Sequence, residues 1–180
     1  GDQAGASNTT GSRNAFIGQN AGGNNTSGNN NIAIGTHAGR KNLTANANIY
    51  IGFQTGFQNT NGNANSYLGY KSGTNATGND NTFMGYISGW NTTTGEGNTF
   101  LGNKAGETNT TGSNNTYIGN EAKGAAGITN STSIGSGAYA NQSNSVILGN
   151  NANVGIGTSA PDATLDLVGN IKITDGTQGY

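Results

Sequence analysis

Residues 98–114 read NTFLGNKAGETNTTGSN, and residues 115–119 begin the same pattern again as NTYIG. The centre of the pattern is an aromatic or small residue, an aliphatic residue and then glycine. Successive aliphatic members along the chain are separated by 17, 17, 17, 16, 17, 17, 16 and 14 residues. Self-similarity at a fixed period is the sequence signature of a repeat architecture. The chain is therefore predicted to be a stack of repeats rather than a conventional globular domain.

Each repeat has the features of one coil of a β-solenoid. The Asn-Thr-aromatic-aliphatic stretch has strand propensity, and the glycine directly after it permits a sharp turn. Asn/Thr-Gly pairs mark the return of the chain. A coil of this length suits two short strands, each pairing with its equivalent in the next coil at about 4.8 Å. We therefore predict an all-β fold, a parallel β-roll (β-solenoid) of ~17-residue coils over residues 1–153.

Strand alternation sorts the apolar side chains into two columns. The aliphatic column is predicted to line the coil interior: Ile17, Ile34, Ile51, Leu68, Met84, Leu101, Ile118, Ile134 and Leu148. The aromatic column then points outward, where so large an apolar surface should not face water. It is predicted to be a subunit interface: Phe16, Tyr50, Tyr67, Phe83, Phe100 and Tyr117.

Composition argues against several classes of protein. The chain has no Cys, so it has neither disulfides nor a thiolate metal site. Its Lys and Arg residues are scattered singly apart from Arg40-Lys41, unlike the basic stripe that nucleic-acid binding requires. It has no run of 18 apolar residues to span a membrane. No signal peptide is visible, and the chain opens inside a repeat-like segment, so we interpret it as part of a longer protein.

Residues 144–149, Asn-Ser-Val-Ile-Leu-Gly, are close to the Asn-Ser-Val-Ala-Ile-Gly motif of a known family. On the basis of this motif, the repeats resemble the left-handed parallel β-roll head of trimeric autotransporter adhesins. Residues 154–161 and 164–173 look like the stretch before the intramolecular chaperone domain of phage tail fibres and of chimeric bacterial adhesive fibres, including those of predatory bacteria. The resemblance implies a homotrimer at the bacterial cell surface, or on a virion. The coil is longer than in the adhesin heads, and a column that is often Ala there is aromatic here.

The repeat changes character near its C-terminal end. Pro161, the only proline, is expected to end the roll because it cannot donate a ladder hydrogen bond. Apolar residues alternate in 165–167 and 171–173 around Gly169-Asn170, which predicts a short hairpin or intertwined strands. Residues 154–180 are thus predicted to be a neck that leads to a further C-terminal region.

Candidate chemistry is sparse. His37 is the only histidine, and Asn20 and Gln54 at the equivalent positions offer it no acid partner. The acids form no calcium-binding Gly-Gly-x-Gly-x-Asp array. We therefore expect no catalytic residue, cofactor or metal, and no enzyme. Phe57 and Trp90, at a variable turn position, could stack on a sugar ring or could instead cover a turn or a neighbouring subunit.

Together these features predict a structural or adhesive segment of a trimeric surface fibre. It would mediate or present attachment to a cell surface, prey or host, with a surface glycan or protein as receptor. Matching Asn and Thr residues are expected to form hydrogen-bonded ladders along the stack. Two alternatives remain open: a shaft segment of a phage tail fibre, and an ice-binding solenoid. The second rests on a column interrupted by Leu43: Thr26, Thr60, Thr77, Thr93 and Thr110.

Overall fold

The computed structural model describes residues 1–171, and the secondary structure there consists of thirteen short strands joined by turns. Most strands are three residues long, as expected for a chain that turns after each aliphatic-Gly pair. The strands are β1 (Ala15–Ile17), β2 (Ile32–Ile34), β3 (Ile49–Ile51), β4 (Ser66–Leu68), β5 (Thr82–Met84), β6 (Thr99–Leu101), β7 (Thr116–Ile118), β8 (Lys123–Gly124), β9 (Thr132–Ile134), β10 (Tyr139–Ala140), β11 (Val146–Leu148), β12 (Val154–Ile156) and β13 (Leu165–Leu167).

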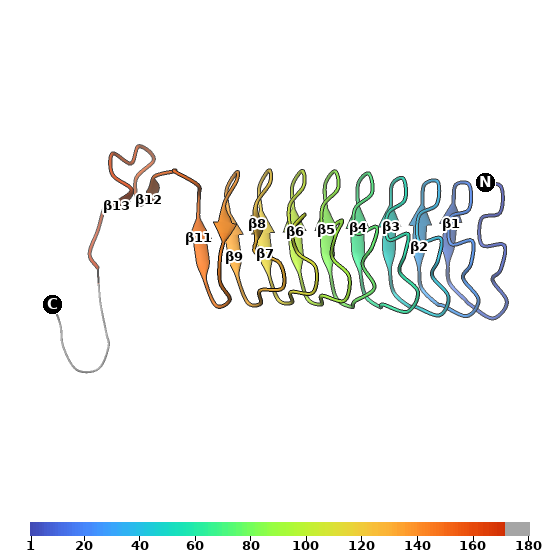
Figure 1. The fold of residues 1–180 in the computed structure, drawn as a ribbon. Coiled ribbons are helices and arrows are strands. Elements are labelled where there is room, and N and C mark those ends of the chain that lie inside the picture. Colours follow the sequence, from blue (N-terminus) through green and yellow to red (C-terminus); the bar gives the residue numbers. More distant parts are fainter. Residues whose placement is uncertain (172–180) are drawn as a thin grey trace. The chain divides into compact units, whose positions relative to one another are not determined.

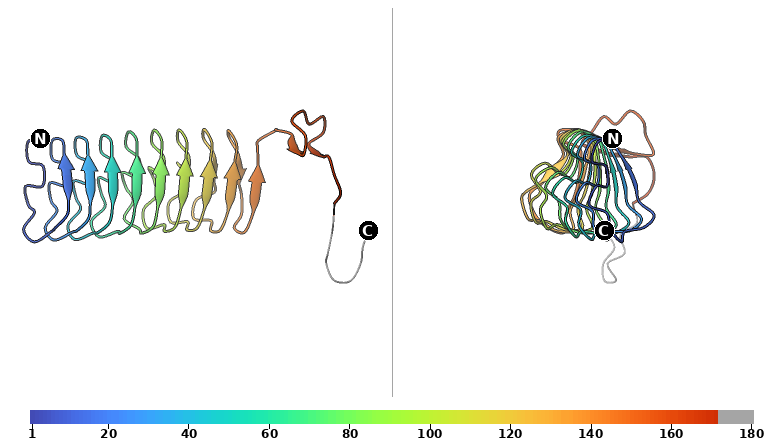
Figure 2. Two further views of the ribbon diagram at one scale, coloured as in Figure 1. Left: turned by 180° about the vertical axis from the view of Figure 1, so that it is seen from behind. Right: turned by 90° about the vertical axis from the view of Figure 1, so that its right-hand side faces the viewer.

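Nine of these strands form one parallel sheet in the order β1-β2-β3-β4-β5-β6-β7-β9-β11. The repeats pair in register, so that Tyr50 lies opposite Tyr67 and Phe83 opposite Phe100. Parallel neighbours need a crossover connection, and here the rest of each coil provides it. Figure 1 shows the coils stacked side by side, and the end-on view in Figure 2 shows them superimposed with a gradual rotation. The expected β-solenoid of about 17-residue coils is confirmed. Within residues 1–171, the second strand expected in each coil forms only as the small parallel sheet of β8 and β10.

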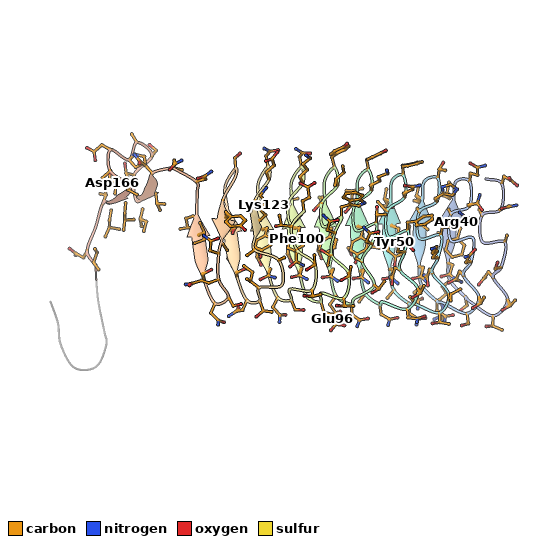
Figure 3. The ribbon with its side chains drawn as sticks, in the orientation of Figure 1. Arg40, Tyr50, Glu96, Phe100, Lys123 and Asp166 are labelled. Atoms are coloured by element: carbon orange, nitrogen blue, oxygen red, sulfur yellow. The ribbon has the colours of Figure 1, made fainter. Side chains whose placement is uncertain are left out.

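The central residue of each strand of the nine-stranded sheet points into the coil, which places the aromatic column in the interior. Five of its side chains have no exposed surface: Tyr50, Tyr67, Phe83, Phe100 and Tyr117. The rings of the last four stack at the coil repeat, with centroids 4.8 Å apart between Tyr67 and Phe83 and 4.9 Å apart between Phe100 and Tyr117. The Tyr50 ring is tilted by 41° against that of Tyr67. Tyr50 and Phe100 are labelled within the coils in Figure 3. The prediction that this column is a subunit interface is therefore wrong, and Phe16 on the first coil is also half-buried against the core.

The predicted coil interior is wrong for the same reason. Every member of the aliphatic column lies on the outer face, partly or largely exposed: Ile17, Ile34, Ile51, Leu68, Met84, Leu101, Ile118, Ile134 and Leu148. A three-residue strand turns one side chain inward and two outward. The inward one can be large because a glycine of the same coil faces it: a Cβ added to Gly89 would lie 2.5 Å from Cδ2 of Phe83. The ring occupies the space that the glycine leaves.

Around the aromatic column the interior is polar, and asparagines satisfy the buried backbone. In each case Oδ1 accepts the backbone N–H of the equivalent residue one coil later, at 2.9–3.0 Å. Nδ2 donates to a turn carbonyl at 2.8–3.0 Å. The predicted asparagine ladder is thus confirmed, and its members are Asn31, Asn48, Asn65, Asn81, Asn98 and Asn115.

The glycine after each strand is required by both conformation and space. Gly102 has a φ of +139°, a region that residues with a side chain avoid. A Cβ added there would lie 2.3 Å from the carbonyl oxygen of Gly119 in the next coil. Close approach of successive coils at this corner therefore depends on glycine.

The described part of the chain divides into two units, one of residues 1–150 and one that begins at residue 151, whereas the sequence-based boundary falls after residue 153. The stacked coils end before Pro161, so the proline is not what ends them. In the second unit β12 and β13 pair in parallel, with Val154 opposite Leu165. Strands β12 and β13 are therefore not the two arms of a hairpin. The predicted hairpin joins residues 165–167 to residues 171–173, and its second strand extends beyond the described residues.

Candidate binding surfaces

The outer face of the nine-stranded sheet is an exposed apolar surface, which we call the aliphatic face. Leu68, Met84 and Leu101 at its centre are 40%, 43% and 43% exposed. Nine large aliphatic side chains on this face are 36–68% exposed. Monomeric proteins rarely expose contiguous apolar patches larger than a few hundred Å². The contributing residues are Ile17, Ile32, Ile49, Leu68, Met84, Leu101, Ile134, Val146 and Leu148.

The aliphatic face has two parallel rows of side chains. The row at the last strand position is aliphatic along the whole sheet, from Ile17 to Leu148. The row two residues earlier starts with Ala15, Ile32 and Ile49, is polar from Ser66 to Thr132, and ends with Val146. The face is therefore a continuous aliphatic ridge beside a row that is polar over its middle and later coils and apolar at both ends.

The turn after each strand carries a second exposed surface. Phe53, Tyr70 and Tyr86 occupy one turn position on successive coils. Their ring centroids are 5.3 and 5.4 Å apart, and their planes differ by 12° and 10°. We call these three residues the outer aromatic ladder. Sequence analysis missed it, although the column comparison that found the interior rings would have revealed aromatic residues directly after the glycine on three successive coils.

Cations lie against aromatic rings at the same turns. The Arg40 guanidinium is 6.0 Å and Lys41 Nζ 5.5 Å from the centroid of the Phe57 ring. Lys71 Nζ is 5.5 Å from the centroid of the Tyr70 ring. Lys41 Nζ also donates to Oε1 of Gln58, an uncharged partner, at 2.8 Å. The turns of coils β2–β4 thus combine positive charge with exposed aromatic surface.

The two sugar-stacking candidates have different surroundings. Phe57 is partly buried and contacts His37, with ring centroids 6.1 Å apart, as well as the two cations. Trp90 is partly buried in the turn after β5, the turn that also carries Tyr86. The structure therefore places Phe57, rather than Trp90, among charged groups that could engage a ligand.

His37 lies among rings rather than among catalytic partners. Its ring centroid is 6.5 Å from that of Phe53, and among the described residues its buried Nδ1 has no hydrogen-bond partner. A general base needs a proton donor or an orienting group within hydrogen-bond reach. Residues 1–171 bring together no group of three or more His, Cys, Asp or Glu side chains that could hold a metal ion.

The buried tyrosine hydroxyls are structural groups. Burial raises the pKa of Tyr50, Tyr67 and Tyr117 above the usual value for a phenol, so they stay neutral at ordinary pH. Asn59 Nδ2 donates to the Tyr50 hydroxyl, and the Tyr117 hydroxyl is 2.8 Å from Oγ of Ser131.

Three hydroxyl groups of the threonine column considered for ice binding donate hydrogen bonds within the chain. The Thr26 hydroxyl donates to the carbonyl of Leu43 at 2.9 Å, and the Thr93 hydroxyl to the carbonyl of Thr110 at 3.0 Å. Thr77 makes the same bond to Thr93 at 3.2 Å. These hydrogen bonds link successive coils, so the three hydroxyl protons are not available to order water.

Comparisons of the chain with protein families, with curated proteins and with solved structures found no match. No helix among the described residues has the length and apolar character needed to cross a membrane. The fold itself defines the class, a β-solenoid repeat protein built from parallel β-roll coils.

Proposed function

We propose that this chain is a non-enzymatic structural and adhesive segment of a homotrimeric surface fibre. The aliphatic face is the observation that carries the proposal. Nine large aliphatic side chains along the sheet are 36–68% exposed on this face. A continuous apolar strip of this extent on a monomer calls for a covering partner.

A second and third copy of the same chain are the partners that this face fits best. The aliphatic ridge runs along the sheet at the coil repeat, so copies aligned in parallel present the same spacing to one another. Three copies around a common axis would bury one strip each in a closed, symmetric assembly. Left-handed winding, the neck and an extracellular location belong to the same proposal and rest on the resemblance to adhesin heads and fibres.

The internal ladders suit a rod. Nine stacked strands at about 4.8 Å extend the sheet by roughly 40 Å. The stacked rings and the asparagine ladder join each coil to the next, so each added coil lengthens the segment without a new kind of contact. Such a segment can hold a tip away from the cell or carry a binding surface itself.

Sedimentation equilibrium of the 180-residue chain tests the trimer. We expect three times the chain mass of 18.0 kDa at micromolar concentration. Leu101→Lys places a charge at the centre of the aliphatic face and should reduce the mass to that of one chain. Thr111→Lys, at an exposed turn position, is the matched control and should stay trimeric. A monomeric wild-type chain would overturn the trimer, and a Leu101→Lys trimer would show that another face mediates it.

A further inference from the structure

We infer that the turn surface formed by His37, Arg40, Lys41, Phe57 and Lys71 together with the outer aromatic ladder binds an acidic polysaccharide. We call these residues the cationic turn surface. The inference deepens the adhesive part of the proposed function and rests on it for its biological setting. The binding itself can be measured whether or not the chain is a trimer.

Charge is unevenly distributed along the stack. Residues 3–79 contain Arg13, Arg40, Lys41 and Lys71 and no carboxylate side chain. Asp80, Glu96, Glu107 and Glu121 follow on later coils. Electrostatic interactions at the surface are screened over about 8–10 Å at physiological salt. An anionic ligand at the first coils therefore meets a locally positive surface although the whole chain has a net charge of −1.

The cations are held where a ligand can reach them together with a ring. Arg40 and Lys41 both lie over Phe57, and Lys71 lies over Tyr70. An Arg guanidinium presents a planar fork of N–H donors that matches the oxygens of a carboxylate or a sulfate. The ladder rings stack on one another, so their exposed edges offer apolar contact to the C–H groups of a sugar, and the Tyr70 and Tyr86 hydroxyls offer hydrogen bonds. Positive charge beside exposed aromatic rings suits a ligand that is anionic, hydroxylated and partly apolar.

The surface is elongated and periodic, which favours a polymer. Phe53, Tyr70 and Tyr86 follow the stacking direction in steps of 5.3 and 5.4 Å. An extended chain lying along the stack would meet one ring at each step and cations at the end near Phe57. Nucleic acid fits less well, because its affinity depends on neutralising many phosphates, and this surface gathers only a few cations.

Calorimetric titration with defined polymers tests the inference. The probes are polygalacturonate, which carries carboxylates, dextran sulfate, which carries sulfates, and neutral dextran. We expect one or both acidic polymers to bind, with neutral dextran at least tenfold weaker. Arg40→Gln and Phe57→Ala should each weaken that binding by about tenfold, a change of about 1.4 kcal/mol. Lys104→Gln, a cation on a later coil at the turn position of Lys71, is the matched control and should change it less than twofold.

Several results would overturn the inference. They are equal binding of neutral and acidic dextrans, no binding of either acidic polymer, or tighter binding of a thymidine oligonucleotide than of both. If Lys104→Gln weakens acidic-polymer binding as much as Arg40→Gln does, net charge alone explains the binding, and this result would also overturn the inference. Trp90→Ala separates the two sugar-stacking candidates and should leave acidic-polymer binding unchanged. Because these variants lie outside the aliphatic face, the mass of each one shows separately whether the trimer persists.

Discussion

Tyr50 and Tyr67 occupy the same interior position on adjacent coils, but their hydroxyl groups have different surroundings. Asn59 Nδ2 donates to the Tyr50 hydroxyl, whereas the Tyr67 hydroxyl lies near the Asn81 side chain but forms no hydrogen bond of normal geometry among the described residues. At the position equivalent to Asn59, the next coil has Ala76. One residue in the following turn therefore decides whether a buried phenol is satisfied.

Tyr67→Phe should stabilise the chain. The substitution removes a buried polar group that makes no hydrogen bond, and such a group costs about 1–3 kcal/mol. We expect the free energy of unfolding in urea to rise by about 1 kcal/mol. Tyr50→Phe is the matched control and should lower it, because it breaks a buried hydrogen bond. Destabilisation by Tyr67→Phe equal to that by Tyr50→Phe would contradict this description of the core.

The buried tyrosines also predict alkaline unfolding. Burial raises the pKa of Tyr50, Tyr67 and Tyr117, while in the unfolded chain a tyrosine ionises near pH 10. Above that pH the unfolded chain binds fewer protons than the folded chain, so stability falls as pH rises. Below it all three phenols are neutral in both states, and their contribution is fully present. Urea titrations between pH 8 and pH 11 should show a decline beginning near pH 10 and a smaller one in Tyr50→Phe. A flat profile through pH 11 would contradict the expectation.

At the scale of the coil, the asparagine ladder is the element that satisfies the buried backbone. Asn98 Oδ1 accepts the backbone N–H of Asn115 at 3.0 Å, and its Nδ2 donates to the carbonyl of Gly112 at 2.9 Å. Asn98→Ala leaves both backbone groups buried without those partners. We expect a loss of about 3 kcal/mol of unfolding free energy, measured by urea denaturation.

Asn103→Ala is the control on the same coil. Asn103 is exposed, and its Nδ2 donates to Oδ1 of Asn120 on the surface at 2.7 Å. Its loss should cost less than about 0.5 kcal/mol. Equal effects of the two substitutions would mean that composition, rather than the interior ladder, determines stability.

The coil could be predicted from sequence because each of its parts depends on local chemistry. Corner glycines such as Gly102 and inward asparagines such as Asn98 recur at the coil period, and each implies a turn or a ladder directly. The orientation of the strands could not be predicted in this way. Alternation separates Phe100 from Leu101 but does not say which column faces inward, since both are apolar. The deciding feature is Gly106, which faces the Phe100 ring and is adjacent to it only after the coil has closed.

The binding surfaces were predicted less well for a related reason. Phe57 was singled out as a variable turn residue, and the structure places it beside Arg40 and Lys41 of the preceding coil. The occurrence of Phe53, Tyr70 and Tyr86 directly after the glycine on three successive coils was available in the sequence. Their exposure was not, because it follows from the direction in which the turn carries them.

At the scale of the whole molecule, the reversed columns change which surface is available for assembly. An interior of stacked rings leaves the aliphatic residues outside, and these form the long strip that we propose is covered by other copies of the chain. The cationic turn surface lies at the turns rather than on that strip, so the side chains proposed to bind a ligand differ from those proposed to be covered by other copies. Assembly and adhesion are thus assigned to different faces of one rod.

Thiol reactivity tests most directly whether the aliphatic face is covered in solution, because the chain has no cysteine of its own. Leu101→Cys places a thiol at the centre of that face, and Thr111→Cys places one at an exposed turn. At micromolar concentration we predict that Cys at position 101 reacts with a disulfide reagent at least tenfold more slowly than Cys at position 111. The two rates should become equal when Leu68→Lys is added to each variant to separate the copies. Equal rates without that substitution would show that the face is open to solvent and would contradict assembly through it.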